Sequence, residues 1–123
     1  MTIRDPKEQL EKIETELRRL GLLIGAIQPA VIVNSAFGMA EMPFEHWLVK
    51  VFLPRAYEAS NRKQWPSNSQ VGTAAIRNFD GQDEYESLIT LLCDFDRVVE
   101  AYSRQEFRRS GRVRIFDYIA MRF

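Results

Sequence analysis

The side chains that could perform covalent chemistry are few in this chain of 123 residues. Cys93 and His46 are its one thiol and its one imidazole, so a nucleophile and base pair would have to come from these two. A single cysteine also excludes an internal disulfide and any metal site built from several cysteines. Neither a glycine-rich phosphate-binding motif nor a nucleophile-elbow motif occurs in the sequence. Cys93 is therefore better interpreted as an ordinary thiol on the fourth helix, in the protein core or at its boundary.

Carboxylates beside Cys93 offer a second chemical option. Asp94, Asp96 and Glu100 are residue types that ligate a hard cation or act as general acids. A calcium-binding loop would need glycine at its sixth position, where Val99 stands. The spacing therefore favours a solvated helix face, and we expect no metal, no cofactor and no catalytic residue.

Aromatic and basic side chains remain as candidates for binding a partner. Trp65 lies in a polar loop, where a tryptophan either anchors a partner or folds back over the helices. Arg55 follows Pro54, which has no amide to donate to the carbonyl of Lys50. Arg55 is therefore expected to bind a partner, or else a freed carbonyl or a helix carboxylate of its own chain. Trp47 is the third candidate, on the apolar face of the same segment.

Charge is unevenly distributed, although 17 basic and 17 acidic residues give a net charge of zero. That balance excludes a uniformly basic surface for nucleic acid. Residues 80–96 contain six carboxylates and no lysine or arginine, whereas residues 97–123 contain seven arginines against three carboxylates. The arginine-rich segment either lies on the acidic stretch of its own chain or contacts a partner's phosphate or carboxylate groups. The arginines proposed for such contact are Arg108, Arg109, Arg112 and Arg114.

Helical periodicity organises the residues that would position these side chains. Asp5 and Pro6 indicate the start of an amphipathic helix of about five turns, whose apolar positions recur as far as Ile24. Gly21 or Gly25 is expected to weaken the end of this helix. Pro54 predicts a kink or a loosened turn in a second helix. Asp83, with Glu86 three residues later, predicts the capped start of a long helix. The expected helices after the first are at 43–61, at 69 or 73 to 79, and at 83–104.

The remaining segments leave alternatives open. Residues 29–42 fit an apolar connector or a short helix, and the tail fits a helix or an alternating strand. Three or four amphipathic helices pack most simply as an antiparallel bundle, so we expect an all-α fold. The bundle would comprise residues 1–104, followed by an arginine-rich, apolar tail at 105–123. No apolar stretch approaches the roughly 20 residues that span a bilayer, and no signal peptide is apparent, which favours a cytoplasmic protein without membrane contact.

The central run of residues 36–55 resembles the signature of the YqcC-like family, and the wider similarity covers roughly residues 5–103. The shared features are a methionine-rich lead, a Pro-Phe pair, a Trp-Leu pair, aliphatic residues that end in Leu-Pro-Arg, and a proline in the polar loop that follows. In this chain these features are Pro43-Phe44, Trp47-Leu48, Leu53-Pro54-Arg55 and Pro66.

The resemblance implies a small bacterial helical bundle of uncharacterised function, often encoded beside a tRNA pseudouridine synthase and without an established catalytic residue. We therefore expect a non-enzymatic accessory or binding protein associated with such a synthase, its tRNA, or both. The alternative is a homodimeric structural or regulatory module in which the apolar tail from Val113 to Phe123 docks on a second copy. A small enzyme is the least expected class.

Overall fold

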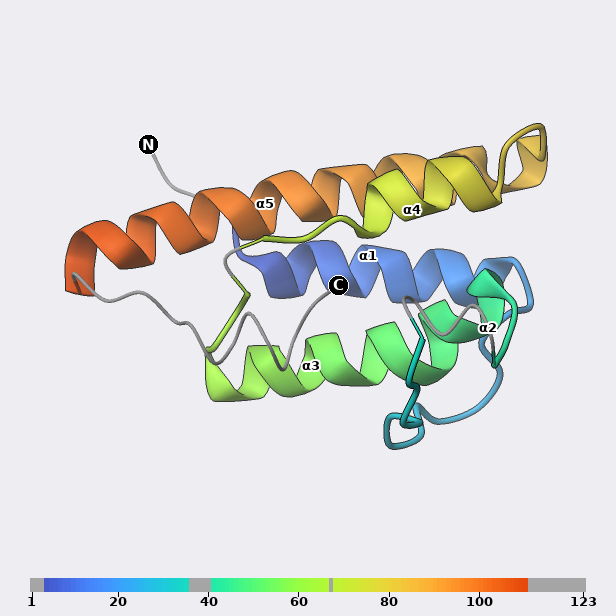
Figure 1. Ribbon diagram of the computed structural model, residues 1–123, viewed down its shortest axis with the longest axis horizontal. Helices are drawn as coiled ribbons and strands as arrows, with labels where there is room; N and C mark the ends of the chain where they lie inside the picture. Colours follow the sequence, from blue (N-terminus) through green and yellow to red (C-terminus); the bar gives the residue numbers. More distant parts are fainter. Residues whose placement is uncertain (1–3, 36–40, 67, 111–123) are drawn as a thin grey trace.

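The fold is a bundle of helices that alternate in direction (Figure 1). The computed structural model describes residues 4–35, 41–66 and 68–110, with the backbone alone for 106–110, and within these residues every regular element is helical. The predicted all-α antiparallel bundle is therefore confirmed, while the helix-or-strand alternative for residues 111–123 falls outside the described residues. The elements are α1 (Pro6–Arg19), α2 (Phe44–Trp47), η2 (Leu48–Phe52), α3 (Leu53–Arg62), α4 (Val71–Asn78), η3 (Asp83–Tyr85) and α5 (Glu86–Ser110).

Helix α1 begins as predicted, and it is closed at Gly21, the first of the two glycines expected to weaken its end. The carboxylate of Asp5 accepts a hydrogen bond from the first-turn amide of residue 7 at 2.9 Å. At the other end, Gly21 has a φ of 76°, and the N–H of Leu22 donates to the carbonyl of Leu17 at 3.0 Å. This left-handed closure satisfies free carbonyls of the last turn and stops the helix there. Ile24, which the periodicity assigned to the apolar face, is consequently 85% exposed.

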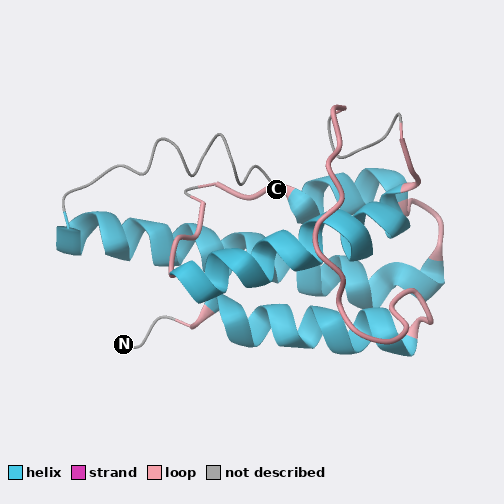
Figure 2. Ribbon diagram, turned by 90° about the horizontal axis from the view of Figure 1, so that it is seen from below, coloured by secondary structure: helices cyan, strands magenta, loops and turns pink. Residues whose placement is uncertain are grey.

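The second predicted helix contains the loosened turn that Pro54 predicts. Helices α2, η2 and α3 follow one another without a break, and η2, just before Pro54, is wound as a π-helix. Since Pro54 has no N–H, the carbonyl of Lys50 loses its usual helical donor. It accepts instead the N–H of Val31 at 2.9 Å. The described part of residues 29–42 forms no helix, so it is a connector, which crosses one side of the bundle (Figure 2).

A chain of aromatic ring contacts runs through the core. Leu10, Ile13 and Leu17 of α1 are fully buried against the other helices. The rings link the loop before α4 with the connection after it, so the two ends of α4 share one core. In order, the contacting pairs are Trp65–Phe95, Phe95–Phe52, Phe52–Trp47, Trp47–Phe44, Phe44–Phe79 and Phe79–Tyr85, with ring centroids 4.2–6.0 Å apart.

Helices α4 and α5 approach closely at Gly72. A Cβ atom on Gly72 would lie 2.6 Å from the Cα of Cys93 and 2.7 Å from its N and Sγ atoms. No larger residue fits without moving a backbone, so glycine here permits the contact between the helices. Beyond this contact α5 continues to Ser110, past Arg104 where the sequence predicts its end.

Candidate functional site

The connection between α4 and α5 turns the chain around a pocket. The N–H of Phe79 closes α4 by donating to the carbonyl of Ala75 at 2.9 Å, and Gly81 takes a φ of 77° in the turn that follows. The chain then enters α5 through the 3-10 turn η3. Asp83 lies inside that turn and caps no helix, so the predicted capping box with Glu86 is wrong.

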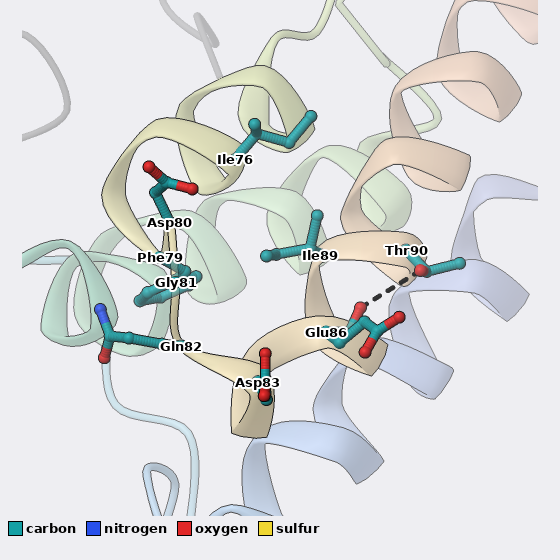
Figure 3. Close-up of a pocket in the computed structure, with 9 residues that line it drawn as sticks. All are labelled: Ile76, Phe79, Asp80, Gly81, Gln82, Asp83, Glu86, Ile89 and Thr90. Carbon is teal, nitrogen blue, oxygen red and sulfur yellow. Dashed lines mark hydrogen bonds between the residues drawn. The ribbon is translucent and has the colours of Figure 1, made fainter.

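The floor of this pocket is apolar. Ile76 of α4 and Ile89 of α5 line it together with Phe79, and the pocket holds about 230 Å³ (Figure 3). Phe79 is buried and stacks on Tyr85, with ring centroids 4.2 Å apart. Ile76 keeps 53% of its surface exposed. An apolar side chain placed here would therefore remove hydrocarbon surface from water.

Three carboxylates stand around the apolar floor. Asp80, Asp83 and Glu86 line the pocket and are exposed (Figure 3). Among the residues that the structure describes, their carboxylate oxygens have no hydrogen-bond or ion-pair partner. The pocket therefore combines an apolar surface with negative charge that the described part of the chain does not neutralise.

Carboxylates farther along α5 are in a different state. Asp94 pairs with Arg97 at 2.9 Å, and Glu100 pairs with Arg104 at 3.1 Å, each about one turn away on the same helix. These exposed pairs leave little net charge along the middle of α5. Within residues 80–96, the exposed carboxylates without a cationic partner among the described residues instead lie in the connection that leads into α5 and at its first residue, Glu86.

The pKa of the Tyr85 hydroxyl is raised at this end of the bundle. Burial is the largest factor that raises its pKa, and the nearby carboxylates of Glu45 and Glu84 raise it further. Negative groups disfavour the tyrosinate because its charge has the same sign.

Asp96 has a structural role at the other end of α4. Its Oδ1 accepts hydrogen bonds from Ser69 Oγ at 2.5 Å and the N–H of Val71 at 3.1 Å, and its Oδ2 accepts the N–H of Gly72 at 2.8 Å. Gln70, at the N-cap position, supplies no side-chain hydrogen bond. Asp96 thus replaces a local cap, and burial raises its pKa to about 6 although these hydrogen bonds lower it. The predicted solvated face is wrong for Asp96, because α4 packs on it.

The sulfur of Cys93 lies beside Asp96 and Gly72. Burial raises the pKa of its thiol, the carboxylate of Asp96 raises it further, and the thiol stays protonated at neutral pH. His46 lies exposed on α2. Within residues 4–35, 41–66 and 68–110, no group of three or more histidine, cysteine, aspartate or glutamate side chains could hold a metal ion.

Both tryptophans lie in the core. Trp47 and Trp65 are each 3% exposed. Trp47 stacks between Phe44 and Phe52, and Trp65 packs edge to face on Phe95 at 5.9 Å. The suggestion that they form a surface anchor for a partner is therefore corrected, and the alternative in which Trp65 folds back over the helices agrees with the structure. The polar sequence around Trp65 does not reveal that the ring of Phe95, from α5, packs against it.

The candidate arginines are not brought together by the described residues. Arg55 is half-buried at the start of α3 and makes no hydrogen bond or ion pair with a described residue. The carbonyl that Pro54 frees is taken by Val31, so Arg55 does not bind it. Two of the other candidates belong to the last turn of α5 and two lie outside the described residues: Arg108 and Arg109, and Arg112 and Arg114.

The pocket residues were not singled out from the sequence. A signal was present, since Asp80, Asp83 and Glu86 belong to the run of carboxylates at residues 80–96. The run does not show which carboxylates face a neighbouring helix and which face an open apolar floor. Ile76 has an ordinary apolar helix position and gave no signal.

A comparison with models of protein families gives a match over most of the chain. The family model DUF446, described as tRNA pseudouridine synthase C, matches residues 5–98, which is most of the chain. No match was found among curated proteins or among solved structures. In the part of the chain that the structure describes, no helix has the length and apolar character to cross a bilayer.

Proposed function

The chain belongs to the DUF446 family, the same family as the YqcC-like proteins, and from this membership and the pocket we propose a non-enzymatic binding protein whose partner is a tRNA pseudouridine synthase. The family description names that enzyme, and the proposal places both proteins in the bacterial cytoplasm. The single observation that carries the binding role is the pocket between α4 and α5, with its apolar floor and its unpaired carboxylates.

The lining of the pocket defines the chemistry of its occupant. Ile76 and Ile89 favour an aliphatic or aromatic side chain, whereas Asp83 and Glu86 favour an adjacent lysine or arginine. A short basic and apolar segment of a protein supplies both groups together. We therefore propose that a segment of this type on the synthase enters the pocket.

The same carboxylates favour a protein over tRNA at this surface. Phosphate groups would meet Asp80, Asp83 and Glu86 without an intervening cation from a described residue. Any contact with tRNA is assigned in this proposal to the arginines at 108–114, which lie at or beyond the opposite end of α5.

The state of the two most reactive groups supports a role without catalysis. The carboxyl of Asp96, whose pKa is about 6, uses both of its oxygens to cap α4. The thiol of Cys93 has a raised pKa and packs against Gly72, which makes it a poor nucleophile. Both groups have a structural explanation that needs no substrate.

The test is binding of the purified chain to the tRNA pseudouridine synthase C of the same organism, measured by titration calorimetry. Charge reversal at the pocket, Asp83→Lys with Glu86→Lys, should weaken binding at least tenfold, because two attractive interactions become repulsive. The control is Glu11→Lys with Glu58→Lys, which changes the net charge equally on exposed positions of α1 and α3.

The control should bind like the unmodified chain. Absence of binding to the synthase at low salt would refute the proposed partner, and equal binding by the pocket variant and the control would refute the proposed site. Binding of tRNA with no binding of the synthase would assign the chain to nucleic-acid recognition instead.

A further inference from the structure

The two ends of α5 carry opposite charge. Residues 80–86, which lead into the helix, contain four carboxylates and no lysine or arginine. Residues 108–114, which start in the last turn of α5 and follow it in the sequence, contain four arginines and no carboxylate and are called the basic segment here. The pocket is therefore at the start of α5, and Arg108 and Arg109 belong to the last turn at the opposite end of this helix, whose course Figure 1 shows.

The described end of α5 lies far from the pocket of its own chain. From Thr90, the last α5 residue that lines the pocket, to Ser110 the axis of the helix runs for about 30 Å. The backbone of Arg108 and Arg109, in the last turn of α5, is therefore well separated from Asp83 and Glu86 of the same chain.

The basic segment has the chemistry that the pocket requires. Arg112 and Arg114 flank Val113, so positive charge alternates with an aliphatic side chain. In the pocket, Asp83 and Glu86 stand beside the apolar surface of Ile76 and Ile89. Charge and hydrocarbon surface are therefore complementary between the two ends of the same sequence.

We infer that the pocket binds residues 108–114 of a second copy of this chain, with the two α5 helices antiparallel. A two-fold axis near the middle of α5, at residue 98, places Glu86 of one copy opposite Ser110 of the other. Each basic segment then lies over the other copy's pocket, and every contact is made twice. This inference rests on the proposed role of the pocket as a binding site, and it adds that self-association occupies the site and competes with the synthase.

The experiment measures the mass of the full chain by light scattering over a hundredfold range of concentration. The acidic-side variant carries Asp83→Lys with Glu86→Lys, and the basic-side variant carries Arg112→Glu with Arg114→Glu. Each variant alone should be monomeric where the unmodified chain is dimeric, because like charges then face each other. An equal mixture of the two variants should recover the dimer. In a mixed dimer the lysines of one pocket face the glutamates of the partner's basic segment, and the other pocket and segment keep their original charges.

The mixture distinguishes docking between copies from an effect on the helix itself. Acidic residues at the start of α5 and arginines at its end also favour its macrodipole, but mixing two weakened helices would not restore a dimer. A salt titration of the unmodified chain gives an independent measurement, in which the dimer should dissociate as salt screens the charges. This second measurement needs no variant to fold.

The inference is overturned if the unmodified chain is monomeric at its highest concentration, if neither variant lowers the mass, or if the mixture stays monomeric. A monomeric chain that still binds the synthase through Asp83 and Glu86 would overturn only this inference. A chain that dimerises as described but never binds the synthase would overturn only the proposed function.

Discussion

The two ends of α4 use the same kind of side chain in opposite ways. At its start, the carboxylate of Asp96 is largely buried and accepts hydrogen bonds from Ser69, Val71 and Gly72. At its far end, the carboxylates around Ile76 are exposed and have no partner among the described residues. The difference shows that a carboxylate stabilises this fold where the chain supplies donors, and is available to a partner where it supplies none.

The largest expected effect comes from filling the space at Gly72. Gly72→Ala should lower the free energy of unfolding by about 3 kcal/mol, because the added Cβ would overlap the backbone of Cys93. This cost exceeds the roughly 1 kcal/mol that alanine gains over glycine in helix propensity. Chemical denaturation measures the loss. Adding Cys93→Ala should not restore stability, because the overlap includes the Cα and N atoms of residue 93. Thr73→Ala, at the next and exposed position, is the control and should cost nothing.

Removal of the Asp96 carboxylate, which caps the start of α4 from α5, should have the next largest effect. Asp96→Ala leaves the hydroxyl of Ser69 and the amides of Val71 and Gly72 without their acceptor, and should cost about 2 kcal/mol in denaturant unfolding. Asp94→Ala is the matched control, because it removes an exposed pair with Arg97 and should cost less than about 0.5 kcal/mol. Equal losses in the two variants would contradict the structural role of Asp96.

The pH dependence of stability should change with Asp96 as well. Its folded pKa of about 6 lies above the ordinary value of 3.8, so the folded protein holds this proton more tightly than the unfolded chain. The resulting stabilisation is complete below about pH 4 and is lost as the pH rises through 6. The stability of the unmodified chain relative to Asp96→Asn should therefore fall between pH 4 and pH 7. The fall should be of about the same size as the loss in Asp96→Ala, because a pKa raised from 3.8 to about 6 corresponds to roughly 3 kcal/mol before the partial exposure of this carboxylate reduces it.

The smallest effect on stability is expected at the open end of α4. Asp83→Asn with Glu86→Gln should change the free energy of unfolding by at most about 0.5 kcal/mol, since neither carboxylate has a partner among the described residues and only the helix dipole is affected. Binding of the synthase should nevertheless weaken in calorimetry. A large loss of stability with unchanged binding would remove the contrast between the two ends of α4.

Prediction from the sequence succeeded where the determining interactions are local. Asp5 and Pro6 begin α1 as predicted, and Pro54 is preceded by the loosened turn that its missing amide implies. The sequence left alternatives open, or predicted wrongly, where a distant segment decides. Trp65 is buried because α5 presents Phe95 to it, and Asp96, which was expected on a solvated face, is covered by the start of α4.

The candidate site shows the same division. The run of six carboxylates at residues 80–96 was visible in the sequence, but Asp96 and Asp83 look alike there. Only the packing of α4 on α5 separates them, because it aims the amides of residues 71 and 72 at Asp96 and leaves Asp83 beside an open floor.

By itself the sequence determined the helical class, the start of α1, the irregular turn before Pro54 and the opposite charges of residues 80–96 and 97–123. These features depend on periodicity, backbone chemistry and composition, which neighbouring residues specify. The tertiary structure alone decided that Asp96 caps α4, that Val31 takes the carbonyl of Lys50, and that the pocket stands open. Each of these depends on atoms far apart in the chain, whose distances exist only once the helices have packed.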